Sequence, residues 1–227
     1  MPSTLLINPS QPDPAVYPRA CEPLEEVGAA EPADAAAALA FALERLTGAE
    51  DSRPWLLATT PMWLRERGRP FARGMERFAP GRLIWVRAEK EAAALWALEE
   101  ALKSGAVAGG LGCVEQPAFV TTRRLEFAAR AGGARGVLLR AGPVSDLSAA
   151  RRRWRIGAAP SGQAAFDAAA PGPARIRAEL VRRRDGPPGC WELEQDNETG
   201  RFGVVAGLAG HGLDASGPAP AGRHAAA

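Results

Sequence analysis

Hydrophobic positions between residues 81 and 112 predict a strand, a helix and a second strand in succession. Residues 83–86 are a short apolar run with β-branched and aromatic members, typical of a strand buried on both faces in a parallel sheet. Residues 89–103 predict an amphipathic helix because their apolar positions recur three and four apart. These positions are Ala92, Leu95, Leu98 and Leu102. Residues 106–111 return as an apolar run of strand length, which completes a βαβ unit.

The same alternation of strand and helix patterns extends from residue 24 to residue 140. The expected strands cover residues 24–27, 54–58, 83–86, 106–111 and 136–139, and the expected helices cover residues 34–46, 89–103 and 119–131, with residues 62–67 helical or loop and residues 68–74 a turn. Repeated strand–helix units bury their strands in one sheet between two helix layers. We therefore expect an α/β fold, a mainly parallel sheet flanked by helices.

Beyond residue 150 the pattern changes to an alternation with a period of two, which is typical of half-buried strands. Arg152, Trp154 and Ile156 are expected to face the core, and Arg151, Arg153 and Arg155 to face solvent. The alternation recurs over residues 175–180 and 191–194, and a last strand is expected over residues 202–205. The sequence therefore predicts a C-terminal antiparallel β extension of the parallel sheet.

Composition divides the chain into three parts. Residues 1–23 are rich in proline and predict a flexible arm, and residues 207–227 are rich in Gly, Pro and Ala and predict a disordered tail. Between them we expect one α/β domain over residues 24–206, with a parallel core (24–140) and antiparallel strands (150–206). An apolar fraction of 46% supports a sizeable core.

Charge and cysteine content exclude few classes of partner, but the cysteines indicate the cellular compartment. The 28 basic and 26 acidic residues nearly cancel, so net charge favours no class of partner. The three cysteines are widely spaced without a neighbouring histidine, which favours reduced thiols in the cytoplasm and no metal site. No export signal and no apolar run long enough for a membrane span are expected.

Several stretches, in this order and at this spacing, resemble the ImuA family of RecA-like (also called SulA-like) accessory proteins of bacterial damage-induced mutagenesis. They are GRLIWVRA, WALEEALKSGAV, TRRLEFAARAGG, GVLLR, AARRRWRI and ELVRRRDGPPGCWELE...TGRF. The likeness extends over residues 24–206.

The resemblance to the ImuA family implies a set of partners. It implies a RecA-type core in a protein that works with ImuB, an inactive relative of Y-family polymerases, and with an error-prone C-family DNA polymerase. Together these proteins carry out translesion synthesis in the SOS response. The resemblance also implies contact with RecA itself.

The stretch after the first expected strand lacks the residues of a phosphate-binding loop. A RecA-like ATPase needs GxxxxGK[ST] there, because the amides, the lysine and the hydroxyl hold the phosphates and magnesium. The sequence is VGAAEPADAAAAL, where Gly28 is a candidate first glycine, and Glu31 and Asp34 add negative charge; Asp34 is also the expected helix N-cap. The strand over residues 106–111 ends in AGGLGC without the expected Asp. We therefore predict a pseudo-ATPase with no catalytic residue, metal or cofactor, and nucleotide binding without hydrolysis stays open.

The arginine-rich region after residue 150 is the strongest candidate for a binding surface. Between residues 151 and 184, nine arginines stand against two carboxylates, a local excess of seven positive charges. The candidates for partner or DNA contact are Arg151, Arg153, Arg155, Arg182, Arg183 and Arg184. They fit an acidic protein surface, single-stranded or primed DNA as an alternative function, or merely the solvated face of an edge strand. The adjacent carboxylates Glu25 and Glu26 are interpreted as solvated charges.

Overall fold

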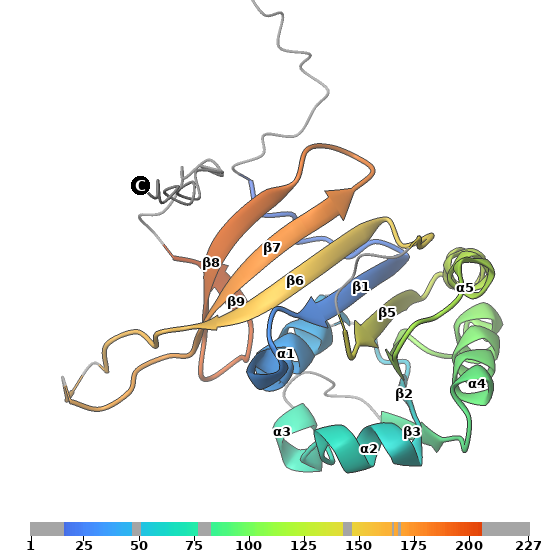
Figure 1. Ribbon diagram of the computed structural model, residues 1–227, viewed down its shortest axis with the longest axis horizontal. Coiled ribbons are helices and arrows are strands. Elements are labelled where there is room, and N and C mark those ends of the chain that lie inside the picture. Colours follow the sequence, from blue (N-terminus) through green and yellow to red (C-terminus); the bar gives the residue numbers. More distant parts are fainter. Residues whose placement is uncertain are drawn as a thin grey trace, which may run out of the picture.

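The computed structural model describes residues 16–46, 51–76, 83–142, 147–164, 166–167 and 169–205, which form one nine-stranded sheet with helices on its faces (Figure 1). The strands are β1 (Leu24–Ala29), β2 (Trp55–Thr59), β3 (Leu83–Arg87), β4 (Gly109–Val114), β5 (Arg135–Arg140), β6 (Arg152–Ala159), β7 (Arg175–Arg183), β8 (Gly189–Gln195) and β9 (Phe202–Val204). The helices are α1 (Ala35–Leu46), α2 (Pro61–Arg67), α3 (Ala72–Glu76), α4 (Glu91–Ser104) and α5 (Phe119–Ala131), and a short 3-10 turn, η1 (Pro32–Asp34), precedes α1.

Strand β1 lies inside the sheet, in the order β3-β2-β4-β5-β1-β6-β7-β8-β9. From β3 to β6 all neighbouring strands are parallel, whereas β6 to β9 pair antiparallel. Strand β6 therefore joins the two parts, because it is parallel to β1 and antiparallel to β7. This arrangement confirms the expected α/β fold class with a C-terminal antiparallel extension.

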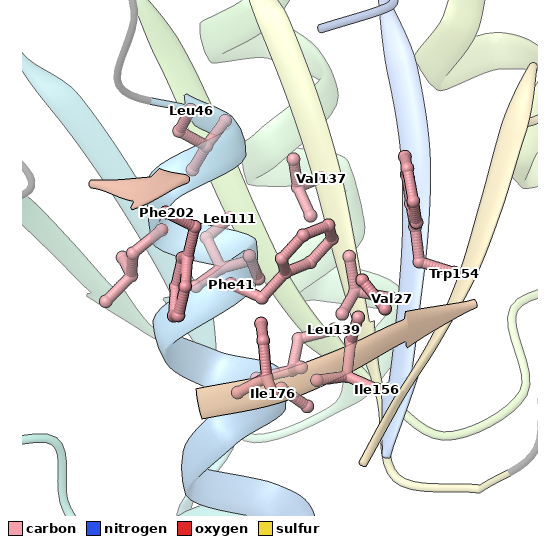
Figure 2. Packing of buried hydrophobic residues seen from close by; sticks show 14 of the residues in the cluster. Val27, Phe41, Leu46, Leu111, Val137, Leu139, Trp154, Ile156, Ile176 and Phe202 are labelled. Atoms are coloured by element: carbon pink, nitrogen blue, oxygen red, sulfur yellow. The ribbon is translucent and has the colours of Figure 1, made fainter. Parts of the chain in front are cut away.

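Each face of the sheet carries its own apolar core, because successive side chains of a strand point to opposite faces. On the α1 face, Phe41 packs among Val137 and Leu139 of β5 (Figure 2). On the other face, Leu138 packs with Leu98 of α4. Helices α4 and α5 lie over β1 to β5 (Figure 1), so the part of the chain that the structure describes places no helix on the outer face of β6–β8.

Glycines in β4 allow α4 to approach the sheet closely. A Cβ atom at Gly112 would lie 2.9 Å from Leu98 Cδ2, and one at Gly110 would overlap Leu98 Cδ1. A side chain at either position would push the helix away, since packed interiors leave no room for an extra methyl group. The glycines of the AGGLGC stretch therefore have a packing role.

The βαβ unit expected between residues 81 and 112 forms with two corrections. Strand β4 begins and ends about three residues later than expected, so Cys113 lies within the strand and not in a loop. Strand β3 is an edge strand, separated from β4 by β2, and its Ile84 side chain is exposed. Burial of β3 on both faces was a wrong prediction, because an apolar run does not distinguish an inner strand from an edge strand whose side chains are only partly covered. Helix α3 also forms where a turn was expected.

The described end of the proline-rich arm is packed against the domain, contrary to the expected flexible arm. Tyr17 is buried, with its ring 5.9 Å from Trp154 and 5.8 Å from Trp191. Arg45 Nη1 donates to the carbonyl oxygens of Pro18 and Arg19, both at 2.9 Å. The rest of the arm (1–15) and the expected tail (207–227) lie outside the described residues.

Candidate functional site

The connection from β1 to α1 occupies the position of a phosphate-binding loop, but the amides of Ala30, Glu31 and Asp34 are engaged within the protein. Ala30 N donates to Ile156 O (2.7 Å), and Glu31 N donates to Asp34 Oδ2 (3.0 Å). The other carboxylate oxygen of Asp34 accepts from Ala158 N of β6 (2.9 Å). Asp34 therefore holds the connection closed against β6. It lies in η1, one residue before α1, and its bonds are to Glu31 and β6.

Gly28 does not begin this connection. It is a residue of β1, in register with Arg140 of β5 and Arg155 of β6. Glu31 is exposed at the start of η1. The three residues of the expected degenerate loop therefore divide between a strand and a short turn, and the connection over residues 30–34 contains no glycine.

The end of β4 differs from the prediction that no carboxylate stands there. Because β4 ends at Val114, the next residue is Glu115, whose side chain is exposed. Glu115 N donates to Glu91 Oε2 (2.8 Å), and Glu115 O accepts from Arg140 Nε (3.1 Å). A carboxylate is thus present one residue after the strand, although the chain has no lysine at the β1–α1 connection.

A cleft of about 150 Å³ lies beside the β1–α1 connection, where β1 and β5 end. Ala35, Ala36 and Leu39 of α1 form one wall, and Trp63, Arg67 and the residues up to Pro70 form another. This edge of a parallel sheet is where ligands bind in open α/β folds. Its volume corresponds to about five water molecules.

The candidate arginines in β6 and directly before it have different surroundings. Arg153 is buried, and its Nε donates to Glu26 Oε2 at 3.0 Å, so its assignment to a solvent-facing stripe was wrong. Arg155 is on the open face of the sheet, as expected, and its guanidinium pairs with Glu179 at 2.6 Å. Arg151 is partly buried and pairs with Glu22 at 2.8 Å.

The arginines at the end of β7 divide in the same way. The side chain of Arg183 is only 2% exposed and pairs with Asp185 at 3.1 Å. This hydrogen-bonded pairing lowers the pKa of Asp185 to about 2. Arg182 and Arg184 are exposed, and neither forms an ion pair with another described residue. They are the two candidate arginines whose charge is open to a partner.

The outer face of β6–β8 is nearly neutral where the strands run side by side. Arg175 pairs with Glu194 at 2.7 Å and lies 3.7 Å from Glu192. Together with Arg155 and Glu179, these pairs place a carboxylate of a neighbouring strand beside an arginine. Moreover, β6 and β7 are inner strands, so the interpretation as an edge-strand face was wrong.

The sequence interpretation missed a buried ion-pair network at the centre of the molecule. Glu25 and Glu26 of β1 are both fully buried, so the prediction of solvated charges was wrong. As neighbours on a strand they point to opposite faces, and each finds its own arginines. Glu25 bonds to Arg45 Nε and Nη2, both at 2.8 Å, and to the Trp154 indole at 2.9 Å. Glu26 bonds to Arg153 and, at 2.5 Å, to the Ser148 hydroxyl.

Electrostatics keep the Glu25 carboxylate charged. Burial by itself would raise the pKa of Glu25, but the adjacent Arg45 guanidinium and its hydrogen bonds hold this pKa below its ordinary value. The same Arg45 side chain binds three carbonyl groups of the arm, at Pro18, Arg19 and Ala20. The network therefore joins β1, α1, β6 and the arm, and it explains why this part of the arm is packed.

Other candidate chemistry has no supporting geometry in the part of the chain that is described. Cys113 is buried in β4, where desolvation raises the pKa of its thiol well above the ordinary value, which disfavours a reactive thiolate. No described group of three or more His, Cys, Asp or Glu side chains is arranged to hold a metal ion. The two histidines lie outside the described residues. Among the described helices, none has the length and apolar character needed to cross a bilayer.

Comparison with known proteins decides the family. The chain is 38% identical over 197 residues to the protein ImuA of two Caulobacter vibrioides strains, and the match covers 80% of this chain and 78% of each relative. The chain belongs to the ImuA family. No family model matches it. Among solved structures, SulA from Pseudomonas aeruginosa is 27% identical, with a TM-score of 0.39, over 53% of this chain and 98% of that one.

Membership of the ImuA family agrees with the sequence resemblance and supports a role in the bacterial translesion-synthesis and mutagenesis system.

The buried network of this ImuA-family chain left one signal in the sequence. Two carboxylates interrupt the apolar strand LEEV, and an arginine at position 45 interrupts an apolar helix. Charged residues at core positions are rarely buried unless they are paired, so these interruptions are what a search for buried ion pairs should use.

Proposed function

We propose that this ImuA-family chain is a non-catalytic adaptor of SOS-induced translesion synthesis. In this proposal it acts in the cytoplasm and binds an ImuB-type inactive Y-family polymerase. RecA and an error-prone C-family DNA polymerase are further members of the assembly. The chain itself supplies a rigid RecA-like scaffold and performs no phosphoryl transfer, so it is a pseudo-ATPase without a cofactor.

The observation that carries this proposal is the closed β1–α1 connection. Phosphate binding at a loop before a helix needs free backbone amides and a nearby cation. Here Asp34 accepts hydrogen bonds from Glu31 N and Ala158 N, and Ala30 N is bonded to β6. The Asp34 carboxylate also repels a phosphate electrostatically, and no lysine lies in residues 24–46. These features support loss of nucleotide hydrolysis even though Glu115 follows β4.

The size of the adjacent cleft supports the same conclusion. Its volume of about 150 Å³ is below the range of about 300–1,000 Å³ that is typical of sites for small organic ligands. A nucleotide with three phosphates would need α2 or the residues up to Pro70 to move away. The proposal therefore favours no stable nucleotide complex.

The catalytic part of the proposal is tested by phosphate release and by nucleotide binding. We expect release at the background rate and no saturable binding of ATP with magnesium, in the presence or absence of single-stranded DNA. A matched variant, Asp34→Ala, frees the Glu31 amide, removes the negative charge of the connection, and so tests whether this carboxylate blocks the site. Release above background in the wild-type chain, lost when Glu115→Gln removes the carboxylate after β4, would overturn the pseudo-ATPase proposal.

The adaptor part of the proposal is tested by a pull-down with purified ImuB and, in parallel, with RecA. We expect recovery of ImuB at micromolar concentration from the full chain. The surface variants Arg182→Ser and Arg184→Ser then test whether these exposed arginines contribute to ImuB binding, while the buried arginines stay unchanged. Failure to recover ImuB at this concentration would count decisively against an ImuB adaptor.

A second candidate function is binding to single-stranded or primed DNA, which the exposed and unpaired Arg182 and Arg184 favour. Each phosphate contact contributes about −0.9 (duplex) or −0.7 (single strand) to the slope of log affinity against log salt. Filter binding over a salt series should therefore show a shallower slope after both residues are changed to Ser. Arg73→Ser with Arg123→Ser removes the same charge elsewhere and serves as the control. Absence of any salt-dependent retention removes this candidate.

A further inference from the structure

The cleft beside α1 is shaped for one apolar side chain. Small or apolar side chains line most of it, including Ala35, Ala36 and Leu39 of α1 and Leu139 of β5. A volume of about 150 Å³ holds about five water molecules, and burying an apolar side chain there would release them. In the sequence, the exposed apolar residues Met62 and Phe71 adjoin the lining residues Trp63 and Pro70.

The charged residues that line the cleft are all arginines. They are Arg67, Arg69 and Arg140, and no carboxylate lines it. Arg140 lies 3.6 Å from Glu26, so the network already occupies it. Arg67 Nη2 donates to Ala141 O (3.2 Å), and the Arg69 guanidinium lies over the Trp85 ring at 5.1 Å. Neither Arg67 nor Arg69 pairs with a described carboxylate, so the rim is complementary to negative charge.

We propose that the cleft binds a short extended segment of a partner protein, in which one bulky apolar side chain is flanked by carboxylates. The apolar side chain fills the cleft, and the carboxylates pair with Arg67 and Arg69. This inference rests on the proposed adaptor function in that the occupant is a protein. It adds the surface and the chemistry of the segment that the surface recognises.

The test is selection of a phage-displayed library of random dodecapeptides against the full chain, followed by affinity measurements on the enriched peptides. We expect enrichment of peptides with Leu, Ile, Met or Phe next to Asp or Glu. The exposed Ala36 faces the cleft, so Ala36→Trp fills it without altering the core. This variant should weaken binding at least about tenfold, which corresponds to about 1.4 kcal/mol. Circular dichroism and thermal unfolding show that each variant is folded.

Two further variants test the contribution of the positive charge at the cleft. Arg67→Glu with Arg69→Glu should also weaken binding at least about tenfold, whereas Arg65→Glu on the same helix, away from the cleft, should change it less than about twofold.

Three outcomes overturn the inference. They are selection of no acidic and apolar pattern, binding that Ala36→Trp leaves unchanged, and saturable binding of ATP that Ala36→Trp abolishes. The library does not contain ImuB, so its result is independent of the pull-down. A failed pull-down would refute the ImuB adaptor function, and a failed selection would refute this cleft as a peptide site.

Discussion

Arg153 and Arg155 are two residues apart on β6, yet the Arg153 side chain is 3% exposed and the Arg155 side chain is 50% exposed. Arg153 is in register with Glu26 at a point where the segment around Ser148 covers the sheet. Arg155 lies further along the strand, beside Glu179 on the open face. The same residue type in the same strand thus belongs to a buried network in one place and to a solvated surface in the other.

The difference between the two regions determines what each arginine contributes. Removal of one partner from a buried pair leaves an uncompensated charge and costs about 3–5 kcal/mol. An exposed pair contributes only about 0–1 kcal/mol, because water solvates both groups well. The network around Glu25 and Glu26 is therefore expected to matter for folding, and the outer face of β6–β8 for contacts.

The largest expected effect comes from Glu25→Ala, which leaves the buried Arg45 without its carboxylate. We expect the free energy of unfolding to fall by about 3–5 kcal/mol, measured by urea denaturation. The matched change on the open face, Glu179→Ala, should cost less than about 1 kcal/mol. Equal losses in the two variants would show that burial does not distinguish the regions. If Glu25→Ala does not fold, Glu25→Gln keeps the shape and gives the same comparison.

The next largest effect is expected from Arg153→Ser in β6, which removes the partner of Glu26 on the opposite face of the sheet. We expect a loss of about 2–3 kcal/mol, since Glu26 loses a charge-assisted hydrogen bond but keeps Ser148 and Arg140 close by. The loss relative to the wild-type chain, measured by thermal unfolding, should be little altered by added salt, because buried pairs are weakly screened. A loss below about 1 kcal/mol would place Arg153 with the solvated arginines.

The pKa of Glu44 in α1 is shifted in the opposite direction to that of Glu25. Burial raises the pKa of Glu44 to about 6, above the ordinary value of 4.5. The folded state thus favours the protonated form, so this contribution is present below pH 4.5 and is lost as the pH rises through 6. Glu44→Gln should therefore increase the free energy of unfolding by about 1 kcal/mol at pH 7 and leave it unchanged at pH 4. A gain that is equal at both pH values would exclude this cause.

The smallest expected effect is that of Arg155→Ser. The pair with Glu179 is exposed, so we expect a change below about 1 kcal/mol that disappears in high salt. Urea denaturation at low and at high ionic strength measures it. A loss of several kcal/mol that persists in high salt would mean that this face is covered in solution.

Local pattern was sufficient for most of the elements and for the fold class. The strands and helices follow from periodicities of two and of three to four, since these depend on neighbours in the sequence. Most of the predicted strands differ from the observed ones by one to three residues, and both α4 and α5 form where they were predicted. In the predicted α4 stripe, however, Ala92 is exposed and Ala94 is buried. The absence of a phosphate-binding lysine was also evident from the sequence, because a motif is local.

Burial of charge was decided by segments far apart in the chain. Glu25 is buried because Arg45, Arg152 and Trp154 converge on it, and Glu26 because Arg153 and Ser148 do. Alternation along β6 indicates which face a side chain is on, but not whether another segment covers that face. The position of β3 at an edge and the closing of the β1–α1 connection by β6 depend on strand order.

The sequence by itself therefore determined an α/β sheet, its antiparallel extension and the lack of a P-loop lysine. Only the tertiary structure decided which arginines are exposed, that Asp34 closes the connection, and that a cleft with a basic rim lies beside it. The physical reason is that periodicity reflects the preferences of adjacent residues, whereas the free energy of a charge depends on the water and partners around it. Those partners are brought together by the fold.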